Sequence, residues 1–256
     1  MIFQGKQLLR KTILLFFLCF ASQINANSRI PFQSGEKLEY SIKWGFFPVG
    51  TAVLEVLPMN EFEDQPCHVV SFRVRTNSFA DKIYKIRTEI KSILDADFNR
   101  TLQYEKKQRE GSTSRDIKVK YDYQKLISVC EEKNSNPIIL PIPLQVLDPL
   151  AIAYFFRIGE LYPGQIKKLP TSDGKKLKDI KVTIGERTRI RVPAGRYYAF
   201  ETIPEMQNLS GVFKKSPDGI LKVWYSDDEK KYPLRISSKV VVGSFTASLE
   251  KITSSK

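Results

Sequence analysis

The sequence predicts a mainly β fold: a large antiparallel meander curled into an open barrel or spiral around one short buried helix at about residues 148–158. Three observations predict it. Apolar and polar residues alternate along much of the chain, clusters of turn-forming residues recur every 8–14 residues, and a single segment is apolar on every side. Alternation buries one face of each strand and leaves the other in water, as in antiparallel sheets.

The clearest predicted strands carry apolar side chains on one face and mostly charged or polar ones on the other. Their apolar sets are Leu38, Tyr40, Ile42 and Trp44; Val70, Phe72 and Val74; Tyr84, Ile86 and Ile90; Ile117, Val119, Tyr121 and Tyr123; and Ile180, Val182 and Ile184. Clusters such as Pro193-Ala194-Gly195 supply turns, and the lysine-rich run 167–181 is predicted to be a hairpin tip. We expect one domain over residues 27–256.

One segment breaks the alternation and predicts a helix. Asp148 suits the N-cap and Pro149 the first helical position, where a missing N–H is tolerated, and Gly159 stands where a C′ glycine is expected. Residues 150–156 (LAIAYFF) are apolar on every side, so the helix must be buried on every side. Something concave must enclose it. The proline-rich approach, 137–144, is expected to be an extended connector.

The N-terminus has the pattern of a secretory signal peptide over residues 1–26. Three cations precede nine apolar residues, 13–21, and the triplet Ile24-Asn25-Ala26 ends in a small residue. A membrane-spanning helix needs about 20 apolar residues. We therefore expect cleavage near Ala26, a periplasmic or otherwise exported location, and no transmembrane span after cleavage. The alternatives are an uncleaved anchor and a lipid attached at Cys19.

The exported chain would keep a basic excess. Its formal charge is +10, because three of the 41 Lys and Arg and none of the 28 Asp and Glu lie in residues 1–26. An exported protein meets little nucleic acid, so we expect no nucleic-acid partner and favour a lipid or another anionic component of the envelope. The alternative is that these cations only form the wet faces of strands. The oligomeric state is left open.

The cysteines and the one histidine give no catalytic motif. Export permits a disulfide between Cys67 and Cys130, but a meander keeps non-consecutive strands apart and pairing needs Cα atoms within about 7 Å. A disulfide and two free thiols both stay open. His68 shares the inward face with Val70 and is interpreted as a satisfied core residue, with Cys67 on the opposite face. We expect no metal site and no cofactor.

The acidic cluster Asp227, Asp228 and Glu229 is the candidate for catalysis. Paired carboxylates about 5–10 Å apart hydrolyse glycosidic bonds, so an envelope hydrolase that uses these residues is the alternative function. The cluster lies between a strand ending near Tyr225 and another starting near Leu234, where an aspartate-rich tight turn is expected. We interpret it as a turn and expect no enzyme activity.

Several segments together resemble an exported bacterial family, domain of unknown function 3108. They are GEKLEYSIKWG at 35–45 with VGTA at 49–52, Asp148-Pro149-Leu150 through Arg157, Val192–Gly195, VWYSDD at 223–228, and YPLRI at 232–236 continuing to Gly243-Ser244. The resemblance covers about residues 35–250. It implies an exported or periplasmic β protein with no established activity, and it implies that Trp44, Gly45, Asp148, Trp224 and Asp227-Asp228 are family features, which could equally determine the fold.

We therefore expect a non-enzymatic cell-envelope protein that binds an amphipathic ligand, such as a lipid tail, or an envelope partner. A sheet wrapped around a helix can leave a cleft beside the helix, and clefts are where ligands bind. Its candidate lining is Trp44, Tyr154, Phe155, Phe156 and Trp224. A purely structural role in envelope assembly is the remaining alternative.

Overall fold

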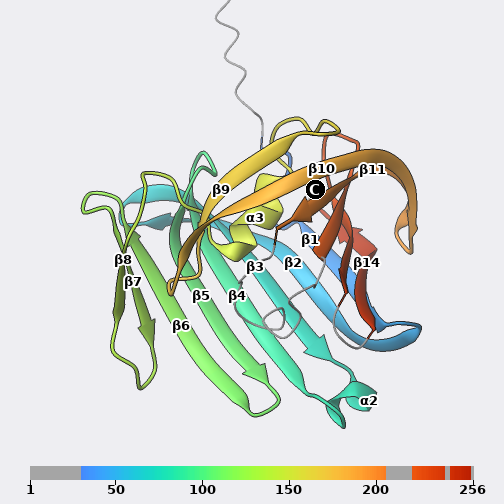
Figure 1. Ribbon diagram of the computed structural model, residues 1–256, viewed down its shortest axis with the longest axis horizontal. Helices are drawn as coiled ribbons and strands as arrows, with labels where there is room; N and C mark the ends of the chain where they lie inside the picture. The colour runs from blue at the N-terminus through green and yellow to red at the C-terminus, as the bar shows by residue number, and fades with distance from the viewer. Residues whose placement is uncertain (1–29, 206–220, 240–242, 255–256) are drawn as a thin grey trace, which may run out of the picture.

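The computed structural model describes residues 30–205, 221–239 and 243–254, so the predicted signal peptide lies outside the described residues. Within the described ranges, fourteen strands form one antiparallel sheet that curls around helix α3 (Figure 1). The strand order is β8-β7-β6-β5-β4-β3-β2-β1-β14-β13-β12-β11-β10-β9. The chain is therefore a meander in which the first strand, β1, pairs with the last strand, β14, in the middle of the sheet. The predicted mainly β, open and curled fold is confirmed.

The elements have the following bounds. The strands are β1 (Lys37–Trp44), β2 (Phe47–Phe62), β3 (Gln65–Thr76), β4 (Ile86–Asp95), β5 (Thr101–Glu110), β6 (Thr113–Asp122), β7 (Ile127–Glu132), β8 (Ile138–Pro141), β9 (Ile166–Ser172), β10 (Leu177–Val192), β11 (Gly195–Pro204), β12 (Leu221–Ser226), β13 (Pro233–Lys239) and β14 (Ser244–Thr253). The helices are α2 (Ser78–Asp81) and α3 (Pro149–Phe155). The hairpin tip predicted within 167–181 is the turn between β9 and β10.

Two local predictions need correction. Tyr84 does not begin a strand, because the short helix α2 follows β3 and β4 starts only at Ile86. Asn77 caps this helix, and its side chain accepts a hydrogen bond from the N–H of Ala80 at 2.9 Å. The proline-rich connector contains the short edge strand β8, where Pro141 is tolerated because an edge strand leaves one side of its backbone unpaired.

Helix α3 begins as predicted and ends earlier. Asp148 is the N-cap and Pro149 the first helical residue, but the helix ends at Phe155 and Phe156 is the C-cap. Two tighter hydrogen bonds continue the turn, from Arg157 N to Tyr154 O (2.9 Å) and from Ile158 N to Phe155 O (3.0 Å). Gly159, with φ of 77°, then turns the chain away. Residues 156–158 therefore form a tight turn between the end of the helix and Gly159.

The core lies between α3 and the concave face of the sheet. Sheet residues from both halves of the meander share one hydrophobic cluster with the helix, among them Leu38, Tyr40, Leu54, Val70, Leu94, Val182, Ile184, Tyr225 and Leu249. Phe32, before β1, packs edge-on against Phe98 at 5.0 Å and against Tyr154 at 5.1 Å between ring centroids. Each fully buried large apolar side chain contributes about 1.5–3 kcal/mol.

The N-terminal end of α3 is tied to the sheet by Asp148, which is fully buried. Its Oδ1 accepts hydrogen bonds from the Ser92 hydroxyl (2.8 Å) and from the N–H groups of Leu150 (2.8 Å) and Ala151 (3.1 Å). Its Oδ2 accepts from the Thr101 hydroxyl at 2.8 Å. Burial raises the pKa of Asp148, although these hydrogen bonds pull in the opposite direction. One side chain therefore caps the helix and fixes it to β4 and β5.

The other end of α3 is tied to the start of β1 by a buried ion pair. Both terminal nitrogens of Arg157 donate to the Glu36 carboxylate, at 2.5 and 2.9 Å, and its Nε donates to the carbonyl of Lys230 at 3.1 Å. The Phe32 ring lies 4.7 Å from the guanidinium. Burial disfavours the charged form, but the hydrogen bonds to Glu36 outweigh it and raise the pKa of Arg157. Arg157 therefore stays charged inside the protein.

We predict that Asp148→Ala lowers the free energy of unfolding by about 3 kcal/mol or more. The substitution removes a helix cap, worth about 1 kcal/mol, and leaves buried hydroxyl and N–H groups unsatisfied at about 1–3 kcal/mol. Asp148→Asn keeps one acceptor oxygen and should lose less. Urea unfolding measures both, with Asn77→Ala at the exposed helix α2 as the control cap. If Asp148→Ala lowered the free energy of unfolding no more than Asn77→Ala does, the result would contradict the role of Asp148 as the anchor of α3.

Candidate functional site

Four of the five aromatic residues predicted to line a cleft, Tyr154, Phe155, Phe156 and Trp224, belong to the main hydrophobic core or pack against it. Tyr154 and Phe156 are only 1 and 2% exposed and belong to the core, and the rings of Phe155 and Phe156 are 5.9 Å apart. Trp44, on β1, stacks on Phe245 at 6.3 Å. Trp224, on β12, pairs across strands with an arginine of β13. Tyr154 and Phe156 pack into the core inside the curled sheet, and the ligand-cleft assignment stays a prediction.

The acidic cluster Asp227, Asp228 and Glu229 lies exposed in the turn between β12 and β13. Asp228 Oδ1 accepts hydrogen bonds from the N–H groups of Lys230 (2.9 Å) and Lys231 (3.0 Å). Asp227 forms an ion pair with Arg187. These contacts are those of an aspartate-stabilised turn, which is how we interpreted the cluster from the sequence.

Cys67 and Cys130 are both buried, and no disulfide joins them in the structure. The register Val70–Ser92–Tyr104–Val119–Cys130 places Cys130 on the same face as Val70, four strands away. Cys67 lies three residues before Val70 on β3 and therefore points to the opposite face. Three strands and the thickness of the sheet separate the thiols, which cannot approach within bonding distance.

His68 is the partly buried, structural residue that the sequence indicates. Its Nε2 lies 3.1 Å from the carbonyl oxygen of Ala96, and its ring centroid lies 5.2 Å from that of Phe98. Among residues 30–205, 221–239 and 243–254, no three His, Cys, Asp or Glu side chains cluster closely enough to hold a metal ion.

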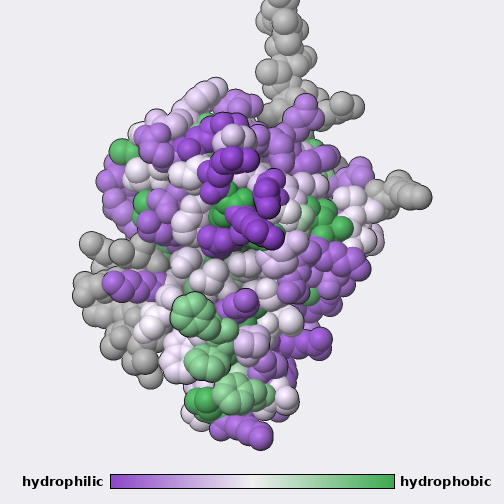
Figure 2. Space-filling model, turned by 90° about the vertical axis from the view of Figure 1, so that its right-hand side faces the viewer, coloured by the Kyte–Doolittle hydropathy of each residue, from purple (hydrophilic) through white to green (hydrophobic). Residues whose placement is uncertain are grey.

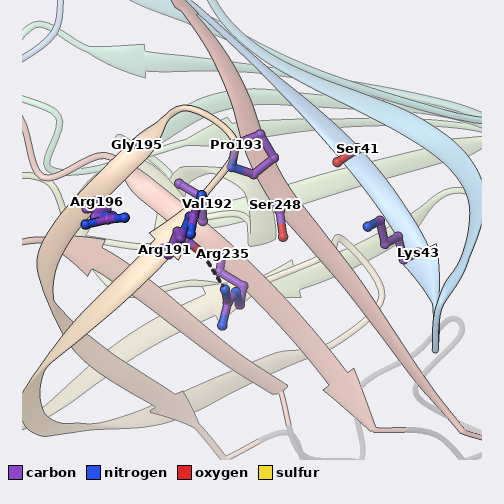
Figure 3. A pocket seen from close by; sticks show the side chains of 9 residues that line it. All are labelled: Ser41, Lys43, Arg191, Val192, Pro193, Gly195, Arg196, Arg235 and Ser248. Carbon is purple, nitrogen blue, oxygen red and sulfur yellow. Dashed lines mark hydrogen bonds between the residues drawn. The ribbon is translucent and has the colours of Figure 1, made fainter.

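A polar pocket of about 540 Å³ lies where the tip of the β10–β11 hairpin meets β1, β13 and β14 (Figure 3). The tip is the predicted turn Pro193-Ala194-Gly195. The N–H of Ala194 donates to the carbonyl of Leu249 at 3.0 Å and holds the tip against β14. That carbonyl lies one residue beyond the last β13–β14 pair on this side, Arg235 with Ser248. The hairpin tip therefore hydrogen-bonds to β14 directly beyond the point where the pairing of β13 with β14 ends.

The lining of this pocket is cationic. It contains Lys43, Arg191, Arg196 and Arg235 together with Ser41, Ser248 and the hairpin tip, and no carboxylate of the described residues lines it. Ser41 pairs with Ser248, which pairs with Arg235, so the three side chains form a row across the sheet. They alternate with core residues and therefore face outward. Figure 3 shows Ser41 and Lys43 on one side of the pocket and the two hairpin arginines on the other.

Arg235 is the pocket residue with a buried donor that no described residue satisfies. One terminal nitrogen donates to the carbonyl of Arg191 at 2.7 Å, and its guanidinium lies 5.9 Å from the Trp224 ring. Its Nε is buried and has no hydrogen-bond partner within the described part of the chain. Burial lowers the pKa of Arg235. A guanidinium with free donors in a pocket without carboxylates suits an anion, because it can bind a carboxylate or phosphate through two parallel hydrogen bonds.

Sequence reasoning missed this pocket because its residues come from five strands, β1, β10, β11, β13 and β14, between positions 41 and 248. The one available signal was the Val192–Gly195 turn, which carries part of the family resemblance. The pairing of β1 with β14, which no local pattern specifies, brings the remaining residues to it.

The fold and the pocket define a β-barrel-like protein with an open sheet, a helix in its interior and a cationic pocket where the tip of the β10–β11 hairpin meets β1, β13 and β14. The chain belongs to the family described as Protein of unknown function (DUF3108), which matches residues 39–250. The resemblance inferred from the sequence is thereby confirmed. None of the curated proteins matches the chain.

Solved structures share the fold at low sequence identity. A β-barrel-like protein of domain of unknown function DUF1849 from Brucella abortus has a TM-score of 0.56 and 10% identity, over 88% of this chain and 99% of that one. A candidate exported protein with a YmcC-like fold from Bacteroides fragilis has a TM-score of 0.33 and 9% identity, over 88 and 98%. A candidate lipoprotein from Parabacteroides distasonis has a TM-score of 0.31 and 10% identity, over 88 and 98%. Of these three, the first alone exceeds 0.5, and it shows the fold alone.

The described residues contain no helix of sufficient length and apolar character to cross a membrane.

We predict that Arg235→Met changes the free energy of unfolding by less than about 1 kcal/mol, as outward-facing substitutions usually do. Arg157→Met, which leaves Glu36 buried without its partner, should cost about 3–5 kcal/mol. Urea unfolding of the two variants compares a half-buried arginine in the pocket with a structural one. Equal losses would mean that Arg235 serves the fold and would remove the case for a binding site.

Proposed function

We propose that this chain is a non-enzymatic, exported protein of the cell envelope that binds the anionic group of an envelope component in the cationic pocket. The observation that carries the proposal is Arg235, whose buried Nε has no partner among the described residues while no carboxylate lines the pocket. Folded proteins usually satisfy such donors internally. Arg235 also lines the pocket, so its guanidinium supplies positive charge there.

The chemistry of the pocket suits a phosphate or carboxylate group. Arg191, Arg196 and Lys43 add positive charge around Arg235, and the hydroxyls of Ser41 and Ser248 can donate further hydrogen bonds. A volume of about 540 Å³ is within the range of small-molecule sites. Because the pocket is polar and α3 occupies the interior, the pocket suits the head group of an amphipathic ligand better than its tail.

The exported location rests on the signal-peptide pattern of residues 1–26, which lie outside the described residues. An exported location agrees with the basic excess of the chain, because envelope surfaces carry anionic groups that a cation-lined pocket can bind. A hydrolase acting through Asp227, Asp228 and Glu229 has less support. Asp228 is committed to the backbone of its own turn and Asp227 to Arg187, and none of the three lines the pocket.

Calorimetric titration tests the proposal with soluble probes. We expect dihexanoylphosphatidic acid and glycerol 3-phosphate to bind, and dihexanoylphosphatidylcholine, whose head group has no net charge, to bind far more weakly. Arg235→Met and Arg191→Gln should each raise the dissociation constant about tenfold or more, since a charge-assisted hydrogen bond contributes about 1.5–3 kcal/mol.

The matched control is Arg109→Gln, which removes an exposed arginine that is paired with Asp116 outside the pocket. It should leave the affinity unchanged. Binding of phosphatidic acid alone would show that acyl chains are required. Absence of binding by both phosphate probes, or equal losses in the Arg109 and Arg235 variants, would refute the pocket as an anion site.

A further inference from the structure

A second surface, separate from the pocket lining, presents large hydrophobic side chains at one end of the sheet. We name it the aromatic tip. Its members and their exposed fractions are Phe46 (95%), Phe47 (63%), Phe79 (56%), Ile83 (70%) and Tyr84 (49%). Figure 2 shows hydrophobic side chains gathered at the lower end of the face turned to the viewer, the end at which Figure 1 places α2. Exposed apolar patches of this kind mark interaction sites.

The aromatic tip is built from two segments that are fixed to each other. Phe46 and Phe47 lie at the turn between β1 and β2, and the other members lie on and after α2. The Asn77 backbone N–H donates to the carbonyl of Val49 at 2.9 Å, and its side-chain amide donates to the carbonyl of Pro48 at 2.7 Å. The two segments therefore present their hydrophobic side chains together.

The next hairpin supports the same end of the sheet. Gly111, between β5 and β6, donates its N–H to the carbonyl of Lys85 at 2.9 Å. It packs so closely under Tyr84 that a Cβ at this position would lie 2.6 Å from the tyrosine ring. Tyr84 is thus held in place although half of it is exposed.

Helix α2 buries its small apolar residue and exposes its large one, whereas helices on the surface of a protein usually turn their large apolar residues toward the core. Its small residue Ala80 faces the protein and is 8% exposed, whereas Phe79 beside it projects into solvent. Phe79 leaves 56% of its surface exposed, and that exposed apolar area adds nothing to the stability of the fold. The position of Phe79 indicates contact with something outside the chain.

The charges around the aromatic tip are mainly positive. Segments 45–48 and 77–87 carry three cations, Lys82, Lys85 and Arg87, and one carboxylate, Asp81. Asp81 is already paired with Arg87, whose hydrogen bonds of 2.7 and 3.1 Å lower the pKa of Asp81. Lys82 and Lys85 are exposed, and neither forms an ion pair with another described residue. The tip thus combines hydrophobic side chains with free positive charge.

We propose that the aromatic tip docks the protein onto an anionic lipid surface, with its rings in the interfacial layer and its lysines at the lipid head groups. Aromatic residues favour the membrane–water interface, and adjacent lysines are attracted to anionic lipids. Two turns at one end of a sheet can reach a flat surface together (Figure 1). A second copy of this chain is a poorer partner, because it would bring like charges face to face.

Cosedimentation with lipid vesicles tests this proposal, using protein recovered from the soluble fraction of the expressing cells. Vesicles of phosphatidylethanolamine and phosphatidylglycerol should bind the protein, and phosphatidylcholine vesicles should bind it at least tenfold more weakly. Phe46→Ser/Phe79→Ser should lower the partition coefficient on anionic vesicles about tenfold, because it removes two of the inserting rings. Lys82→Gln/Lys85→Gln should reduce the preference for anionic over neutral vesicles.

The matched control is Ile139→Ser/Leu144→Ser, which removes two hydrophobic residues of similar exposure, 62 and 67%. Ile139 lies in the edge strand β8 and Leu144 shortly after it, outside the aromatic tip. The control should change vesicle binding less than twofold. Equal losses in the control and tip variants, or no loss in the tip variant, would overturn the proposal. So would a dimer, seen by analytical ultracentrifugation, that the tip variant converts to a monomer. Arg235→Met should leave vesicle binding intact, which separates failure of the tip from failure of the pocket.

Discussion

The fold depends on helix α3 being held at both of its ends by buried polar contacts. Apolar packing alone would let a short hydrophobic helix slide or rotate within a curled sheet, because such packing has little direction. Asp148 fixes one end to β4 and β5, and Arg157 fixes the other to Glu36 at the start of β1. Satisfied buried networks of this kind specify one arrangement, since each broken contact leaves an unpaired polar group. The helix thereby sets how the sheet curls around it.

This filled interior determines where function can reside. The concave face, which would hold a ligand in a hollow barrel, is covered by Tyr154, Phe156 and their neighbours. The remaining surfaces are the outward face of the sheet and the loops at its ends. The cationic pocket lies where a hairpin tip docks against β14, and the aromatic tip lies at the β1–β2 turn and α2. One surface suits an anionic group and the other a lipid interface, and both agree with the basic charge of the chain.

The sequence was informative wherever the physics is local. Alternation predicted β1 and β3, and the pair Asp148-Pro149 predicted the start of α3, because caps and strand faces depend on near neighbours. Contacts between distant segments were not predictable. Glu36 and Arg157 are 121 residues apart, and the pocket requires the register of β1 with β14. Helix α2 was missed because it has four residues, too few for a periodic signal, and Tyr84 continues the alternation of β4 by coincidence.

Native-state amide hydrogen exchange tests most directly whether α3 is the fixed centre of the structure. If its polar ends hold it, the amides of residues 152–156 will exchange only through global unfolding, with the same opening free energy as the central amides of β4 and β5. Their protection will fall together in denaturant. Exchange of the helix through a separate opening of lower free energy, while the sheet remains protected, would contradict the account.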